Sequence, residues 1–343
     1  MTTTPKPLPK SAAGRTWVRV WRKLYNRLGF QNGYNFPLFV ILAGAMMGFT
    51  LARLQYLNIN GTFLLRTIPG DAVRYVRGTK RIGIIIHLAC ILPASFLVCF
   101  QFVPVIRHKA LLVHRLNGYV LILLLLLSNA GAYIITPTAA GGNPATQTGM
   151  GVIASLTTIS IILAYINIKR LRIDLHRAWM LRTWVYAGSI ISLRLIAFAG
   201  AHYIGTHQDN VYYYDVQNCE HIWSQYALFG VNVTDPKRNP VPFLYPQCTT
   251  PNASMRVTVR ANPYSGQPEG LTATMNILFG MALWLALAVH AAGVELYLWL
   301  TPRESERLRI VSQERRAEAG AEKSDLQDKT AYRPAHQGDH IAG

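Results

Sequence analysis

The sequence predicts an all-α, polytopic transmembrane helical bundle of about six spans. Three observations indicate this fold class. Apolar runs of about 20 residues recur along the chain, and at ~1.5 Å per residue each covers the ~30 Å hydrocarbon core of a bilayer. Hydrophobic residues make up 51% of the 343 residues, and the mean hydropathy is +0.19. Lys and Arg residues collect beside the apolar runs, as they do in membrane proteins.

The domain organisation follows from these runs. We expect spans at residues 36–54, 82–106, 116–135, 150–168, 179–204 and 271–300. A basic tail, 1–35, precedes them, and a long polar loop, 205–270, separates the fifth span from the sixth. The segment 301–343 is charged and polar, which is typical of a solvated, partly disordered tail.

The distribution of basic residues predicts the orientation. The tail 1–35 holds seven Lys and Arg residues, the turn 107–115 holds three and the turn 169–182 holds five. The alternate connections hold none in 136–149 and four in 205–270. Positive charge favours the cytosolic side, so we expect both termini in the cytosol and the 205–270 loop in the lumen, most simply of the endoplasmic reticulum.

One segment goes against this orientation. It is 55–80, which carries four basic residues on the side expected to be lumenal: Arg66, Arg74, Arg77 and Lys80. Two other features agree with the orientation. The three glycosylation sequons, at Asn60, Asn232 and Asn252, all fall on the lumenal side. Cys219 and Cys248, the cysteines outside the spans, fall there too and could form a disulfide in an oxidising lumen.

Charge and composition also bear on partners. The net charge of +18 is compatible with nucleic acid, but the basic residues collect beside the separate apolar runs instead of forming one patch, which argues against that class. Membrane lipid is the expected partner of these residues. The chain lacks aspartate-rich metal-binding runs, so no metal is predicted.

Ionisable side chains inside spans are costly and are therefore functional candidates. The candidates are His87, His114, His176, Arg194, His290 and Glu295. Glu295 is the only carboxylate inside a predicted span, and without a cationic partner it would keep its proton and could act as an acid. Pairing with Arg115, Arg177 or Arg182 would instead give it a structural role.

The histidines and the arginine have alternatives of their own. His114 and His176 each precede an arginine at a helix entrance, where such pairs also bind lipid phosphate. Arg194 lies too deep in its span to reach the interface and should face a partner inside the bundle. His290 lies five residues before Glu295, about 140° away around a helix, so the two side chains are expected to have separate partners.

The order of these motifs resembles a widespread, uncharacterised family of multi-pass membrane proteins. The motifs are His87, then Gln101-Phe102, then His114-Arg115-x-x-Gly118-Tyr119, then His176-Arg177-x-Trp179-Met180-x-Arg182, then Arg194. The fungal branch of this pattern is similar to the membrane-bound terpene cyclases of ascochlorin and ascofuranone biosynthesis. The resemblance covers roughly residues 82–200.

The resemblance implies a cofactor-free isomerase. Its substrate would be a lipophilic prenylated aromatic molecule whose terminal double bond has been epoxidised. Such a reaction needs an acid that protonates the epoxide oxygen and a way to end the reaction by proton loss. Glu295 is the first candidate for the acid, followed by His87 and His290.

Two other functions stay open at this point. The first is a haem-b electron carrier of the cytochrome b561 type, with His87 and His202 near one membrane face and His114, His176 and His290 nearer the other. The second is a transporter or a structural membrane protein. A visible spectrum of the purified protein separates the haem carrier from the isomerase.

Overall fold

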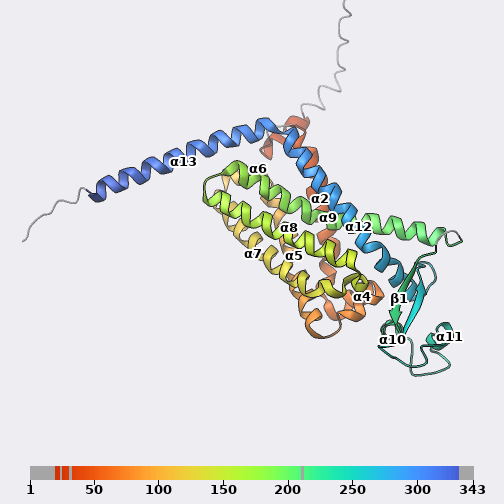
Figure 1. The fold of residues 1–343 in the computed structure, drawn as a ribbon. Coiled ribbons are helices and arrows are strands. Elements are labelled where there is room, and N and C mark those ends of the chain that lie inside the picture. Colours follow the sequence, from red (N-terminus) through yellow and green to blue (C-terminus); the bar gives the residue numbers. More distant parts are fainter. Residues whose placement is uncertain (1–19, 24, 31–32, 210–211, 332–343) are drawn as a thin grey trace, which may run out of the picture. The chain divides into compact units, whose positions relative to one another are not determined.

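The computed structural model describes residues 20–23, 25–30, 33–209 and 212–331. Most of the predicted basic tail, residues 1–19, lies outside the described residues, as does 332–343. Six described helices are long and apolar enough to cross a membrane. They are α2 (Asn35–Arg53), α5 (Gly78–Gln101), α7 (Leu111–Ile135), α8 (Pro144–Lys169), α9 (Ile173–Thr206) and α12 (Pro268–Leu300) (Figure 1). The predicted number and type of spans is confirmed.

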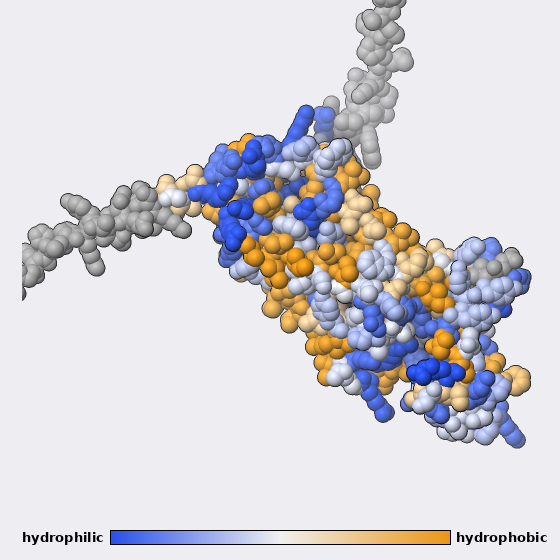
Figure 2. All heavy atoms as spheres, in the orientation of Figure 1, coloured by the Kyte–Doolittle hydropathy of each residue, from blue (hydrophilic) through white to orange (hydrophobic). Residues whose placement is uncertain are grey.

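These helices carry apolar side chains on their outer faces. Ile41 of α2, Leu112 and Leu123 of α7 and Leu195 of α9 are each more than half exposed. The exposed apolar residues make much of the surface beside the helices orange in Figure 2, whereas hydrophilic residues gather near the helix ends. A helix satisfies its own backbone hydrogen bonds, so such a surface can face lipid.

Two boundaries differ from the prediction. The second span was expected to run to residue 106, but α5 ends at Gln101 and a separate short helix, α6 (Pro104–Lys109), follows. Pro104 lacks an N–H group and disfavours the helical conformation of the residue before it, so it ends one helix and begins another.

The second difference concerns the C-terminal segment. Residues expected to be partly disordered form a long helix, α13 (Pro302–Ala331). Arg307 pairs with Glu304 at 2.7 Å and Arg309 pairs with Glu306 at 2.6 Å, and such pairs three residues apart support an exposed helix.

The chain folds into two compact units. The first contains the described residues of 1–154 and 188–287, and the second contains those of 155–187 and 288–331. In the first unit α5 packs along α7, and α2 packs on α5. A small apolar core of Phe63, Tyr75, Ile84 and Ile135 joins these helices to the segment between the first two spans.

That segment is mostly helical. It contains η1 (Leu54–Leu57), η2 (Ile59–Phe63), α3 (Leu64–Arg66) and α4 (Pro69–Arg74). Two of the four basic residues that oppose the charge rule have polar partners: Arg66 Nη1 donates to Gln55 Oε1 at 3.0 Å, and Arg74 pairs with Asp71.

The loop between α9 and α12 forms a small folded cap, which consists of the described residues of 207–267. It contains β1 (Tyr214–Asn218), α10 (Cys219–Leu228), α11 (Val241–Leu244) and β2 (Arg256–Arg260). The strands are antiparallel, with Asn218 opposite Arg256. A disulfide joins Cys219 to Cys248, with 5.2 Å between their Cα atoms. The cap packs on the inter-span segment through α10 and α4, which lie side by side in Figure 1.

The second unit holds the other ends of α8, α9 and α12 together with α13. Ser312 Oγ of α13 accepts a hydrogen bond from the backbone N–H of Ile173 at 2.9 Å and donates to Asp174 Oδ1 at 2.9 Å. The first backbone N–H groups of a helix have no partner within the helix, so Ser312 caps α9 and ties α13 to it.

Candidate functional site

The six side chains that the sequence analysis proposed are divided between the two units. The first unit holds His87, His114 and Arg194, and the second holds His176, His290 and Glu295. Among the residues that the structure describes, no three His, Cys, Asp or Glu side chains lie close enough to hold a metal ion.

Glu295 has the partner that gives it a structural role. Its Oε1 and Oε2 accept hydrogen bonds from Arg182 Nε at 2.6 Å and Arg182 Nη2 at 2.8 Å. The Glu295 side chain is 53% exposed. A two-pronged pair of this kind fixes both side chains and joins α9 to α12. The first choice for a free, proton-donating acid is therefore occupied in the structure, and the alternative partner named from the sequence is the one observed.

The histidines are held by helix packing. His87 Nδ1 lies 3.1 Å from the Ser128 carbonyl and 3.0 Å from Ser128 Oγ, which joins α5 to α7. His176 Nδ1 donates to the Ala164 carbonyl at 2.9 Å, and His290 Nδ1 donates to the Val185 carbonyl at 2.7 Å. At the start of α7 the His114 carbonyl accepts from Gln101 at 3.1 Å. Each of these contacts links two helices.

Arg194 lies differently. Its guanidinium group sits over the Phe279 ring, with 5.5 Å between the guanidinium carbon and the ring centroid. Its Nε is buried and has no hydrogen-bond partner. The charge of Arg194 acts on Asp71 in α4, so it belongs electrostatically to a polar cluster at the cap end of the first unit.

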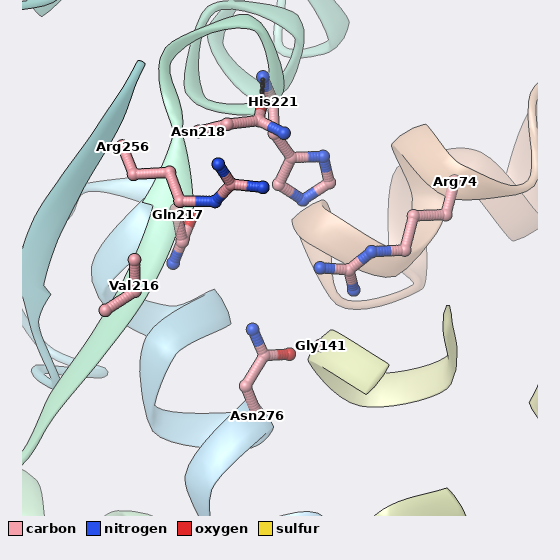
Figure 3. Close-up of a pocket in the computed structure, with 8 residues that line it drawn as sticks. All are labelled: Arg74, Gly141, Val216, Gln217, Asn218, His221, Arg256 and Asn276. Carbon is pink, nitrogen blue, oxygen red and sulfur yellow. Dashed lines mark hydrogen bonds between the residues drawn. The ribbon is translucent and has the colours of Figure 1, made fainter. Parts of the chain in front are cut away.

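The centre of that cluster is a cavity of about 230 Å³, called here the cap cavity. It is lined by Arg74, Gly141, Val216, Gln217, Asn218, His221, Arg256 and Asn276. Figure 3 shows the side chains of Arg74, Arg256, His221 and Asn276 directed toward a common space from four segments. Arg74 comes from α4, Arg256 from β2, His221 from α10 and Asn276 from α12.

The position of Arg74 is set by α4. Pro69 occupies the first turn of this helix, where a missing N–H costs nothing, and Asp71 follows in the same turn. Asp71 Oδ1 accepts from Arg74 Nη1 at 2.9 Å and from the backbone N–H of Ala140 at 3.0 Å. The side chains of Asp71 and Arg74 are only 12% and 17% exposed. This is a buried carboxyl–guanidinium pair: Arg74 lines the cavity, and Asp71 pairs with it at 2.9 Å.

The cap places His221 against α4. Asn218 caps α10 by accepting from the His221 backbone N–H at 2.7 Å. The side-chain Nε2 of His221 is buried and has no hydrogen-bond partner. A Cβ added at Gly70 would overlap Thr272 and approach this Nε2 to 3.0 Å. Gly70 therefore permits the close approach of His221 and α12 to α4.

Asn276 is held from two sides. Its Nδ2 donates to Asp215 Oδ2 at 2.7 Å, and its carbonyl accepts from Asn143 at 2.6 Å. Gly141, with φ of +80°, packs so close to Asn276 that an added Cβ would lie 2.7 Å from the amide carbon. Only glycine suits both the left-handed conformation and this approach.

Burial sets the charge states around the cavity. Desolvation raises the pKa of Asp71 above its usual range, although Arg74 and the Ala140 N–H lower it. Desolvation also raises the pKa of Asp215, against the hydrogen bonds from Asn276 and Gln217. Burial, reinforced by Arg74, lowers the pKa of His221 to about 3, so this imidazole is neutral at physiological pH. The lining thus combines two guanidinium groups with a neutral imidazole.

A second layer of polar contacts supports this arrangement. Thr272 Oγ1 accepts from the Gly70 N–H at 3.0 Å and donates to Gln225 at 2.7 Å, and Gln225 donates to Gln217 at 3.0 Å. Below it, Glu269 is fully buried and accepts from the hydroxyl groups of Tyr226 at 3.1 Å and Tyr245 at 3.3 Å. This network ties α4, the cap and the start of α12 together, so the cavity lining is preorganised.

This cluster cannot be predicted from the sequence. Its members come from segments that are far apart in the sequence, and no local spacing relates them. One signal was present: Asp71 is a carboxylate beside arginines in the segment 55–80, the part that opposed the charge rule.

These features define a multi-pass helical membrane protein with a polar cavity where its spans meet the cap. Residues 84–217 match the family model described as predicted membrane protein (DUF2306). The chain is also 23% identical over 321 residues to "Ava biosynthesis cluster protein G" of Aspergillus versicolor, covering 79% of this chain and 90% of that protein. No solved structure matches the chain. The family match supports the resemblance to uncharacterised multi-pass membrane proteins, and the relative comes from a fungal biosynthesis cluster.

Proposed function

We propose that this protein is a membrane-bound enzyme of small-molecule biosynthesis that cyclises an epoxidised, prenylated aromatic substrate. The relative from a biosynthesis cluster supports a biosynthetic role, and the motif resemblance supports the reaction class. Spans that expose apolar side chains to lipid would let a lipophilic substrate reach the protein from the bilayer.

The observation that carries the proposal is Asp71. Burial raises the pKa of its carboxyl group even though Arg74 lies 2.9 Å away, whereas Glu295 is more than half exposed; this difference in burial is why we propose Asp71 as the proton donor. It lies beside the cap cavity, and Arg74 and Ala140 fix its orientation. We assign Asp71 the role that Glu295 was expected to have.

The reaction is an isomerisation and balances without a co-reactant. The proton moves from the Asp71 carboxyl to the epoxide oxygen as the bond from that oxygen to the more substituted carbon breaks. A double bond of the prenyl chain attacks this carbon and closes the ring. The resulting cation then loses a proton to a base. That base is the Asp71 carboxylate left by the first step, so the carboxyl group is restored and the product has the same composition as the substrate.

The test is turnover in microsomes. Full-length protein is expressed in a host that lacks it, microsomes are given the epoxide, and a product of the same mass with a different retention time is sought. The proposal expects product with the wild type and a rate about 100-fold lower with Asp71→Asn, which keeps size and hydrogen bonding but removes the transferable proton. Normal turnover by Asp71→Asn at equal expression would contradict the assignment of the acid.

A visible spectrum distinguishes a haem-binding electron carrier from the proposed isomerase. If the protein binds haem between its histidines, the purified protein has a Soret band that scales with its concentration, and the band is lost when His87 or His290 is replaced. The isomerase proposal expects turnover in preparations that have no such band.

A further inference from the structure

We propose that the cap cavity binds the anionic oxygen group, a carboxylate or a phosphate, of a small amphiphilic molecule. The inference concerns binding, and it does not depend on the cyclisation reaction. It rests on the cations that line the cavity, on the unpartnered imidazole and on the size of the space.

Two arginines line the cavity, and their partners differ. The guanidinium group of Arg74 forms an ion pair with Asp71, whereas Arg256 has no ion pair among the described residues. The one hydrogen bond recorded for the Arg256 side chain is a long contact of 3.5 Å to the Ser254 carbonyl. Guanidinium groups donate to carboxylate and phosphate oxygens through paired N–H groups. Arg256 therefore lines the cavity with donors that lack an anionic acceptor.

The imidazole and the carboxyl groups near the two arginines are arranged in a way that favours an anion. His221 Nε2 is buried without a partner and lies between the two arginines in Figure 3. The nearby carboxyl groups are turned to other partners: Asp71 Oδ1 to Arg74 and Ala140, and Asp215 Oδ2 to Asn276 and Gln217. The charged groups that an anionic ligand in the cavity would contact are therefore the guanidinium groups and not the carboxylates. Neither Asp71 nor Asp215 is among the residues that line the cavity.

The volume of the cavity limits how much of a ligand it can enclose. The cavity of about 230 Å³ is smaller than the ~300–1,000 Å³ of pockets that enclose a whole drug-sized ligand. It has room for a head group, and a larger apolar part must lie outside it. The cavity lies where α4, α12 and the cap meet, at the end of membrane spans, so an amphiphile could leave its tail in the bilayer.

The test uses the full chain purified in uncharged detergent at fixed ionic strength. The probes are inorganic phosphate, 4-hydroxybenzoate and the neutral analogue 4-hydroxybenzamide, with affinity measured by calorimetry. We expect at least one of the anions to bind and the amide to bind at least ~10-fold more weakly, because a hydrogen bond to a charged group is worth more than a neutral one. Absence of anion binding, or equal binding of the benzoate and the amide, would overturn the proposal.

Variants locate the site. Arg256→Gln removes the cation without an ion-pair partner from an exposed position on β2 and should weaken binding of the anion ~10-fold or more. Arg238→Gln removes the same charge from an exposed cap position, 77% exposed at its side chain, and serves as the matched control. Equal affinities of the two variants would show that the anion binds elsewhere and would overturn the proposal.

A further arm separates the two sources of the anion. The chain is placed in nanodiscs of phosphatidylcholine alone or with added phosphatidic acid, and binding of the preferred anionic probe is repeated. Loss of probe binding with phosphatidic acid, in the wild type and in Arg238→Gln alike, identifies a lipid head group as the occupant. Unchanged binding identifies a small soluble or substrate-borne anion. This experiment follows the calorimetry that shows anion binding at the cap cavity of the wild type.

Discussion

Two carboxylate–guanidinium pairs lie in different units of this chain. Asp71 and Arg74 are joined at 2.9 Å, with side chains that are 12% and 17% exposed. Glu295 and Arg182 are joined at 2.6 Å, with side chains that are 53% and 21% exposed. The exposed pair joins two helices and needs little support. The buried pair is held by Ala140, by the cap above it and by α12, and it adjoins a cavity.

The difference shows why a carboxylate inside a span is a weaker sign of function than its rarity suggests. Glu295 stood out in the sequence because it lay within an apolar run, but a neighbouring helix supplies an arginine. Asp71 lay outside every predicted span, in the segment 55–80, yet the fold buries it and raises its pKa. Surroundings, more than position along the chain, decide whether an acid keeps a proton.

The largest effect on stability is expected at the cap. Replacing Cys219 and Cys248 with Ser removes a link across 29 residues, which should lower the free energy of unfolding by about 3–4 kcal/mol. Because the cap supplies His221 and Arg256, the cavity should be lost as well. Thermal unfolding of the detergent-solubilised protein measures the change, and Cys90→Ser, at a free cysteine in α5, is the control. Thiol labelling of both residues in unreduced, denatured wild-type protein would rule the disulfide out.

The two ion pairs should differ in stability. Arg74→Gln leaves Asp71 buried without its cation and should cost about 1–3 kcal/mol, with uptake of a proton by Asp71 limiting the loss. Arg182→Gln breaks the exposed pair and should cost about 0–1 kcal/mol. Denaturant or thermal unfolding of both variants under one condition makes the comparison. A greater loss from Arg182→Gln would reverse the ranking of the two sites.

The neutral imidazole of His221 should make stability depend on pH. Its pKa is about 3 in the folded protein and about 6.5 when unfolded, so between these values the unfolded state binds more protons. Stability is therefore lost as the pH falls below about 6.5, by up to about 2 kcal/mol by pH 5. His221→Gln should remove this part of the pH dependence. An unchanged slope of melting temperature against pH in the variant would show that His221 titrates normally.

The smallest effects are expected at the sequons. Asn60, Asn232 and Asn252 are exposed and belong to the inter-span segment and the cap, which pack together. If this end of the spans is lumenal, glycosidase treatment shifts the mobility of the wild type, and replacing the three asparagines with Gln abolishes the shift at almost no cost in stability. A C-terminal tag protected from protease in sealed microsomes would contradict the orientation.

The spans could be predicted because their signal is local. Each is a continuous apolar run, and only the ends moved, as at Pro104, where proline divides the expected second span. The disulfide followed from the position of two cysteines outside the runs. The cap's strands were not anticipated, since Tyr214–Asn218 and Arg256–Arg260 are short and pair only across the folded loop.

The cavity could not be predicted in the same way. Arg74, His221, Arg256 and Asn276 are ordinary polar residues in four separate segments, and tertiary contacts alone bring them together. Arg194 was expected to face a partner within the bundle, and it lies over Phe279 and acts on Asp71. The sequence pointed to polar groups inside the spans, whereas the structure gathers the best-supported site where the spans meet the cap.

Whether Asp71 or Glu295 donates the proton can be decided by comparing three proteins. Turnover of the epoxide is measured in microsomes with wild type, Asp71→Asn and Glu295→Gln at matched expression. Both substitutions keep the size of the side chain and remove its carboxyl proton. We expect a rate about 100-fold lower for Asp71→Asn and a rate near that of the wild type for Glu295→Gln. Full activity of Asp71→Asn together with loss of activity in Glu295→Gln would contradict this expectation.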